Sequence, residues 1–249
     1  MMRAAVIAFA FLTRLPMPKV AWDVQAQAAS LKWYPLVGAV LGLIFVMAAW
    51  CLQHVPAIPA AAVMLTLWVV VTGALHLDGL ADSADAWIGG MGDRERTLAI
   101  MKDPRCGPAG VMSLIVVSLV KFAALTAVVG AGLPAIGAGG PLPWALLLPP
   151  LLARGALVAL FLTTPYVRNN GLGAPLRGAP AFGCQIAVLL TILSTFAFGY
   201  AGAKAFIAAL LVGFLWRRAC MKRLSGFTGD TAGAMVELIE AATLIALLL

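Results

Sequence analysis

Charged residues are scarce in this sequence. Asp, Glu, Lys and Arg make up 11% of its 249 residues, whereas 63% are hydrophobic and the mean hydropathy is +1.00. This composition excludes an ordinary soluble domain, and apolar runs of about 20 residues recur along the chain. The sequence therefore predicts an all-α, polytopic helical bundle that forms one integral membrane domain over residues 1–249.

Cysteine pairs are also missing. The four cysteines are scattered, without a CxxC spacing or a Cys/His pairing, which excludes a disulfide framework and a zinc site. They are Cys51, Cys106, Cys184 and Cys220. We interpret them as packing residues or incidental thiols.

Basic residues occur in every second connection between the apolar runs. Lys and Arg occur before residue 36 and in 78–108, 164–180 and 217–231, but are absent from 55–57, 131–142 and 200–202. This is the positive-inside pattern of about seven spans with a cytoplasmic N-terminus, so the net charge of +7 is no nucleic-acid signal. The predicted spans are 36–54, 58–77, 109–130, 143–163, 181–199, 203–216 and 232–249.

The two ends of the chain are less regular. The first 15 residues resemble a signal peptide, but the charged and proline-containing stretch that follows is unlike a cleavage region. We expect an interfacial or re-entrant helix within 1–35, ended near Pro16. At the other end, 203–216 is short and 232–249 holds Glu237 and Glu240, so one of these spans is expected to be re-entrant or tilted.

Acidic residues concentrate directly after the second predicted span. Asp78, Asp82 and Asp85 are three of the chain's ten acidic residues, spaced i, i+4 and i+7. On a helix this spacing stacks the carboxylates on one face, where they repel one another. A divalent cation such as Mg²⁺ removes the repulsion, and Gly79 allows backbone or ligand to approach. The alternative is a solvated acidic turn beside a membrane helix.

Two further polar loops fall on the same predicted cytoplasmic side. Residues 101–110 combine Lys102, Asp103 and Arg105 with two glycines, and Gly226–Gly233 is a Gly/Thr-rich turn that opens a helix. Such a turn presents backbone N–H groups suited to phosphate. Taken alone, the glycines could mark a simple turn and the bases could be positive-inside charges. Together, the loops 78–108 and 217–233 predict a cytoplasmic active site for metal and diphosphate.

Other polar residues carry less specific signals. His76 precedes the acidic cluster and is interpreted as structural. Glu237 and Glu240 are interpreted as a structural or lumen-lining pair. The loop that contains Tyr166 and Arg168 is compatible with substrate binding but does not specify it.

Five separate motifs make the sequence similar to the cobalamin synthase family, also called adenosylcobinamide-GDP ribazoletransferases. They are Phe11–Pro16, Tyr34–Gly38, Leu75–Asp82, Met101–Arg105 and Thr228–Asp230. The resemblance extends from the N-terminus to about residue 235. Between about 131 and 215 it consists mainly of hydrophobicity and length. Pro104 and Cys106 depart mildly from the expected pattern.

The resemblance implies the last step of adenosylcobalamin assembly. Adenosylcobinamide-GDP reacts with α-ribazole or its 5'-phosphate, giving adenosylcobalamin or its 5'-phosphate and GMP. It also implies a Mg²⁺-dependent, multi-pass enzyme of the bacterial inner membrane whose active site faces the cytoplasm. The expected partners are these substrates and the lipid bilayer, with no nucleic acid. Homo-oligomers and contacts with other cobalamin-assembly enzymes stay open.

Our mechanistic hypothesis assigns each candidate residue a role. Asp78 and Asp82 coordinate Mg²⁺, with Asp103 or Asp230 completing the shell. Asp85 accepts the hydroxyl proton. Lys102 and Arg105 stabilise the leaving GMP. The substrate-binding residues are Arg14, Gly79, Thr228, Gly229 and Gly233.

Two other classes of protein compete with this interpretation. A CDP-alcohol phosphatidyltransferase also uses an Asp-Gly-rich helix and Mg²⁺, but its D-x2-D-G-x2-A-R motif has an Asp and an Ala-Arg pair that this chain lacks. A transporter would place its acids near mid-span in paired, interrupted helices. Here the acids are expected at helix ends, and no internal repeat is evident.

Overall fold

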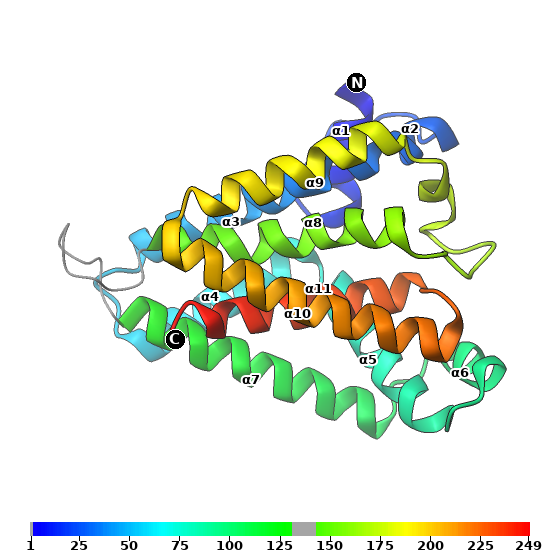
Figure 1. The fold of residues 1–249 in the computed structure, drawn as a ribbon. Coiled ribbons are helices and arrows are strands. Elements are labelled where there is room, and N and C mark those ends of the chain that lie inside the picture. The colour runs from blue at the N-terminus through cyan, green and yellow to red at the C-terminus, as the bar shows by residue number, and fades with distance from the viewer. Residues whose placement is uncertain (1, 131–142) are drawn as a thin grey trace.

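The computed structural model describes residues 2–130 and 143–249, and within these ranges the regular elements are helices (Figure 1). The all-α prediction is therefore confirmed. The α-helices are α1 (Met2–Leu12), α2 (Val24–Ser30), α3 (Tyr34–Cys51), α4 (Ala57–Thr72), α5 (Leu75–Gly89), α6 (Arg94–Ile100), α7 (Pro108–Gly130), α8 (Leu148–Thr163), α9 (Ala181–Phe196), α10 (Gly199–Leu224) and α11 (Gly229–Ala246). Short 3-10 turns η1 (Leu31–Trp33), η2 (Pro143–Leu147) and η3 (Ala174–Gly178) join some of them.

Four helical segments of the described chain are long and apolar enough to cross a membrane. They are Val24–Cys51, Pro108–Gly130, Trp144–Thr163 and Gly199–Leu224, and the bent pair α4–α5 makes a fifth if it counts as one span. A polytopic helical membrane protein is thus confirmed. Each of the seven predicted spans coincides with a helix, but the count of seven spans stays a prediction. The predicted connection 131–142 lies outside the described residues.

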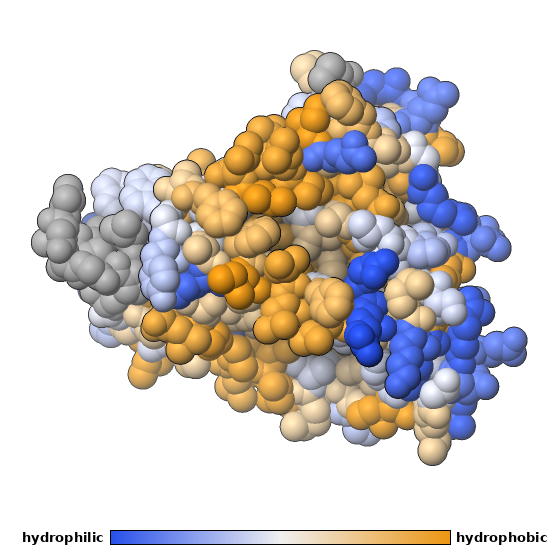
Figure 2. Space-filling model, in the orientation of Figure 1, coloured by the Kyte–Doolittle hydropathy of each residue, from blue (hydrophilic) through white to orange (hydrophobic). Residues whose placement is uncertain are grey.

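The surface divides into an apolar body and a polar end. Figure 2 shows hydrophobic side chains over most of the visible face, with hydrophilic ones gathered at the end where α5 and α6 lie in Figure 1. Large apolar side chains such as Leu119 on α7, Leu190 on α9 and Leu211 on α10 are exposed. In water such a surface would be unstable, whereas in a bilayer it faces lipid tails.

Small residues let α3 and α8 approach closely. A Cβ atom on Gly38 would lie 2.3 Å from the carbonyl oxygen of Pro150, and one on Gly42 would lie 2.6 Å from the Cα of Leu147. Glycines four residues apart allow this backbone contact, which replaces hydrophobic burial as the driving force between helices in lipid. They explain how α8 reaches the centre of the bundle, where most of its residues are buried.

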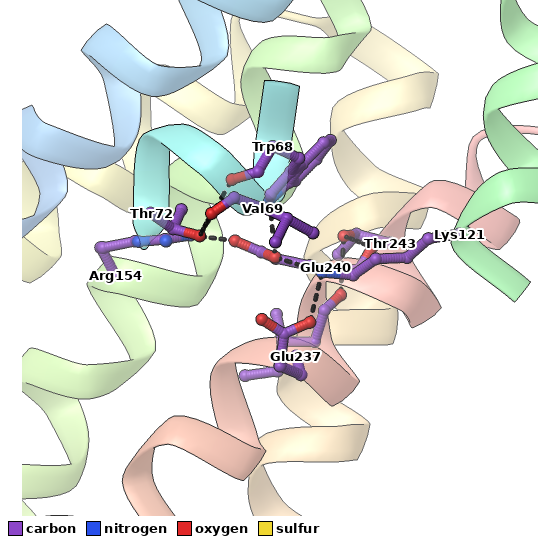
Figure 3. Close-up of polar contacts among 9 residues, drawn as sticks. Trp68, Val69, Thr72, Lys121, Arg154, Glu237, Glu240 and Thr243 are labelled. Carbon is purple, nitrogen blue, oxygen red and sulfur yellow. Dashed lines mark hydrogen bonds and ion pairs between the residues drawn. The ribbon is translucent and has the colours of Figure 1, made fainter. Parts of the chain in front are cut away.

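A cluster of four charged side chains occupies the core (Figure 3). The Nζ of Lys121 on α7 lies 2.6 Å from Glu237 and 2.5 Å from Glu240, both on α11. Arg154 on α8 pairs with the other oxygen of Glu240, and the indole N–H of Trp68 on α4 donates to Glu240 over 3.0 Å. Two positive and two negative charges therefore cancel, and four helices meet at Glu240. The structural role favoured for Glu237 and Glu240 agrees with this burial.

The chain turns sharply between α4 and α5. The two helices meet at 89°, and the residues between them, Gly73 and Ala74, both have left-handed φ angles of 63° and 57°. The side chain of Arg14 packs over Gly73 so closely that a Cβ there would lie 2.2 Å from its Nε. The backbone N–H of Arg14 also donates to Val71 over 2.7 Å. The N-terminal segment thus holds the bend that orients α5.

Replacing Lys121 by Met tests the contribution of the ion cluster. Both glutamates would lose their shared cation in a buried site, and we expect a loss of about 3–5 kcal/mol in the free energy of unfolding. Lys19→Met, at an exposed position outside the helices, should leave stability unchanged. Thermal unfolding in detergent micelles, followed by circular dichroism, compares the two. Equal midpoints would show that the cluster does not stabilise the fold.

Candidate active site

Helix α5 carries the acidic face that its spacing predicts. Asp78 is exposed and Asp82 is half-buried, whereas His76, Gly79 and Leu80 on the same helix are buried. The buried side of α5 packs against α11 and α7. The helix is therefore amphipathic in an unusual sense, with carboxylates on its open side and small or apolar residues in the bundle.

The start of α11 lies directly against this face. A Cβ on Gly79 would be 2.6 Å from the carbonyl oxygen and 2.9 Å from the Cα of Asp230, so only glycine permits the contact. Thr228 is the N-cap of α11, and its hydroxyl and that of Thr231 exchange hydrogen bonds with each other's backbone N–H groups. This capping box fixes the first turn, in which Asp230 lies. Asp230 is therefore held against the acidic face of α5 at Gly79.

A loop after α8 forms the third side of the site. Tyr166 and Phe227 are bridged through their backbones, with Phe227 donating to Pro165 and Val167 donating to Phe227, each over 2.9 Å. This places Arg168 beside α11, where its Nη2 lies 2.8 Å from Asp230 and donates to the carbonyl of Met101 over 3.2 Å. Arg168 therefore ties three separate segments together at the acidic face.

These elements enclose a cavity of about 160 Å³. Five of the predicted site residues line it, and they come from two helices far apart in sequence. They are Asp78, Gly79, Gly229, Asp230 and Gly233. His76, Tyr166 and Arg168 line it too, together with several apolar and aromatic side chains. The convergence of the acidic helix and the glycine-rich turn, expected from the sequence, is therefore present in the structure.

The donors at this site fit a hard divalent cation. Among the described residues, no three His, Cys, Asp or Glu side chains are already close enough together to enclose a metal ion. Mg²⁺ does not need such a cage, since one or two carboxylates, substrate phosphate and water commonly complete its shell. Neither Asp78 nor Asp82 forms an ion pair with a described basic residue, so both carboxylates remain available.

Neither Asp82 nor Asp85 lines the cavity, and Asp85 is bound to other groups. One of its carboxylate oxygens accepts from the backbone N–H of Gly107 over 2.7 Å, and the other accepts from Gly110 over 2.8 Å. Both groups lie at the start of α7, where free N–H groups favour a carboxylate. The geometry gives Asp85 a capping function and offers no support for its expected role as the base, which stays a prediction.

The predicted site residues of the loop before α7 also lie outside the cavity. Asp103 accepts two hydrogen bonds from the side chain of Arg105, over 2.6 and 2.9 Å. These hydrogen bonds hold the pKa of Asp103 down at about 2. Neither residue lines the cavity, and Lys102 is exposed. Asp103 is therefore not brought to the predicted metal shell, although its neighbour Met101 contacts Arg168 and Thr228.

Two predicted substrate-binding residues, Arg14 and Thr228, lie near the cavity but do not line it. Arg14 packs over Gly73 at the α4–α5 bend and does not line the cavity. Thr228 is buried, and its hydroxyl caps α11. Their places in the structure support the site through backbone positioning, whereas direct contact with a ligand was expected.

Several residues of this region were missed or left unassigned by sequence reasoning. Lys121 and Arg154 are lone bases within apolar runs, and intramembrane charges of this kind call for a buried partner such as Glu237 or Glu240. That signal could have found the ion cluster. For Arg168 the sequence indicates no more than a loop compatible with substrate binding, and Phe161 carries no signal, because their place at the cavity depends on the fold of the loop after α8.

Gly79→Ala tests the contact between α5 and α11. The added Cβ must displace the backbone at Asp230, so we expect a loss of about 1–3 kcal/mol in the free energy of unfolding. Gly213→Ala is the matched control, because its Cβ would meet its nearest atom at an ordinary 3.7 Å and alanine favours a helix. In thermal unfolding in micelles, the midpoint of Gly79→Ala should fall below that of the unsubstituted protein, and the midpoint of Gly213→Ala should rise slightly above it. A Gly79→Ala protein as stable as the control would contradict the close contact.

Comparison with known proteins agrees with the arrangement of the site. A family model described as cobalamin-5-phosphate synthase matches residues 4–248. The chain is 48% identical to the adenosylcobinamide-GDP ribazoletransferase of Pseudomonas paraeruginosa (strain PA7), with 100% of this chain and 98% of the relative covered. It is also 48% identical to the protein of that name from Stutzerimonas stutzeri (strain A1501), with 98% of this chain and 96% of the relative covered.

Among the solved structures, the comparison found no match for this chain. The family match nevertheless spans nearly the whole sequence, and it includes α5, the loop before α7 and the start of α11. The chain belongs to the cobalamin-5-phosphate synthase family.

Proposed function

We propose that this chain is an adenosylcobinamide-GDP ribazoletransferase. It joins adenosylcobinamide-GDP to α-ribazole or α-ribazole 5'-phosphate, giving adenosylcobalamin or its 5'-phosphate and GMP. The observation that carries the proposal is that Asp78 and Asp230 line one cavity, with Asp82 one turn further along α5, in a chain that matches the family over its length. The curated relatives bear the name of this activity.

The reaction is a substitution at phosphorus. Because α-ribazole 5'-phosphate is also an acceptor and its 5'-phosphate stays in the product, the attacking group is a ring hydroxyl of the ribose and not the 5'-hydroxyl. Its oxygen forms a bond to the phosphorus attached to cobinamide and loses its proton, the bond from that phosphorus to the bridging oxygen breaks, and GMP leaves with that oxygen. Such a transfer depends chiefly on positioning and on neutralising phosphate charge. We assign Asp78, Asp82 and Asp230 to hold Mg²⁺. When bound, this ion would supply positive charge to the diphosphate.

The remaining charges near the site divide into fixed and exposed groups. Arg168 is fixed beside Asp230 and supplies positive charge next to the cavity. Lys102 and Arg105 are exposed on the neighbouring loop, and we assign them to the leaving GMP. The first turn of α11, with Gly229 in the cavity wall, supplies backbone N–H groups for phosphate.

We propose a location in the bacterial inner membrane, with the site facing the cytoplasm. Hydrophilic side chains gather at the end of the molecule where α5 and α6 lie (Figure 2), and the basic connections of the sequence include those beside both helices. Basic loops remain on the cytoplasmic side during insertion. Water-soluble substrates would then reach the acidic cavity without crossing the bilayer.

Asp78→Asn tests the metal site and the function together. Loss of one charged ligand should lower GMP formation by at least about 100-fold, because a charge-stabilising contact of the reaction is removed. The assay uses membranes that contain the chain, adenosylcobinamide-GDP, α-ribazole 5'-phosphate and Mg²⁺. Glu95→Gln, at an exposed acid of α6, is the control and should retain activity. EDTA should stop the unsubstituted protein.

The outcomes of this assay separate the classes of protein. GMP and a complete corrinoid that appear only with metal and with Asp78 support the proposal. Near-normal activity of Asp78→Asn would remove this residue from the metal shell. Transfer from a CDP-linked donor to a lipid alcohol, without GMP, would assign the chain to the phosphatidyltransferases instead.

Asp85→Asn asks whether this residue is the base or a cap. The amide oxygen of Asn can still accept one backbone N–H, but its NH₂ group faces the other donor, which should cost about 1–3 kcal/mol of stability. We expect GMP formation to stay within about tenfold of the unsubstituted protein, since a base would contribute 10²–10⁴-fold. A loss of about 100-fold with an unchanged unfolding midpoint would return the role of base to Asp85.

A further inference from the structure

The cavity has two unlike sides, and the proposed chemistry uses only one of them. Its charged side is formed by Asp78, Asp230 and Arg168. The rest is lined by aromatic pairs and leucines. The rings of Phe161 and Tyr166 stack 5.9 Å apart at 16°, and those of Phe11 and Tyr34 lie 6.3 Å apart. An ion and a diphosphate have no use for this apolar wall.

We propose that the aromatic side of the cavity binds the base of the acceptor nucleoside, and so determines which acceptor the enzyme uses. This inference rests on the proposed function and identifies where its smaller substrate binds. The base of α-ribazole is a benzimidazole, a flat bicyclic ring with one unsubstituted ring nitrogen. Stacking on aromatic side chains is the usual way in which proteins hold such a ring.

The size of the cavity favours this occupant. Its volume of about 160 Å³ is close to that of the engineered apolar cavity of about 150 Å³ that binds benzene. A bicyclic ring fits such a space when its sugar extends into the open mouth. The corrin macrocycle of the other substrate does not fit and must remain outside. The cavity is therefore a site for one flat ring.

The polar groups on this side suit a base with few hydrogen-bonding atoms. His76 lines the cavity, is 4% exposed, and its Nδ1 has no hydrogen-bond partner among the described residues. An imidazole N–H can donate to the single free nitrogen of a benzimidazole. Guanine carries several donors and acceptors on its edges, and an apolar wall would leave most of them without hydrogen-bond partners, which disfavours its binding there.

The wall is also held in place before any ligand binds. The hydroxyl of Tyr166 accepts from the backbone N–H of Gly173 over 3.3 Å, and a Cβ on Gly171 would lie 2.2 Å from that hydroxyl. The ring of Phe161 meets Phe227 edge-on at 4.8 Å. Because the base would lie against fixed rings, its ribose would extend toward the carboxylates. That places the attacking ribose hydroxyl on the side where the reaction is proposed to occur.

Calorimetry with purified protein in micelles tests the inference, using α-ribazole alone without donor or Mg²⁺. Phe161→Ala removes one stacking ring and should weaken α-ribazole binding by about 5- to 100-fold. Phe161→Leu keeps an apolar side chain while removing the flat ring, and should show a loss in the same direction if the alanine variant is unstable. Phe196→Ala is the control, because this ring contacts Phe206 at a tilt of 51° and is exposed on α9, away from the cavity.

Kinetics then separates this inference from the proposed function. In Phe161→Leu, the KM for α-ribazole should rise while the KM for adenosylcobinamide-GDP stays unchanged. A rise confined to the donor KM, or displacement of α-ribazole by guanosine in the calorimeter, would assign the cavity to the guanine and overturn the inference. Absence of α-ribazole binding to the unsubstituted protein would overturn it as well. Failure to form GMP in every assay would instead refute the proposed function.

Discussion

The ion cluster at Glu240 is the interaction that positions the rest of the molecule. A carboxylate taken out of water without a partner is very costly, so Glu240 holds Lys121, Arg154 and Trp68 around it. These partners come from α7, α8 and α4. Helix α11 is therefore fixed along its axis and about it. Asp230 lies in the first turn of the same helix, seven residues or roughly 10 Å before Glu237, so the core determines where the site's acid lies.

The same protein treats its charges in two opposite ways. In the core, two bases and two acids neutralise one another within hydrogen-bonding distance. At the acidic face of α5, Asp78, Asp82 and the neighbouring Asp230 carry charges of one sign, and of these three Asp230 has an ion pair with Arg168 in the described chain. Self-sufficient charges stabilise a fold, whereas uncompensated charges of one sign at an open surface provide affinity for a ligand of the other sign. This contrast indicates which acids are structural and which are proposed to act.

Sequence reasoning succeeded where one segment carries the whole signal. Apolar length located seven helices, and the i, i+4, i+7 spacing located the acidic face of α5. Sequence reasoning failed where the partner of a residue lies far along the chain. Asp85 accepts hydrogen bonds from Gly107 and Gly110, which are 22 and 25 residues away, and the spacing within α5 cannot reveal these partners. For Asp103 the reason is local: Arg105, two residues later, already donates a hydrogen bond to the carboxylate that was expected to bind the metal. The sequence shows Lys121 and Arg154 as lone intramembrane bases, but only the folded structure shows that both of them pair with Glu240.

The bend between α4 and α5 explains why an acidic helix can adjoin a membrane span. Had α5 continued along α4, its three carboxylates would extend the membrane span. The turn of 89° directs the helix across the bundle instead. Ala74 takes a left-handed conformation there at a cost of about 1–2 kcal/mol, and Arg14 packs over Gly73 beside it. Arg14 thus meets the chain at the bend that directs α5, and not at the cavity.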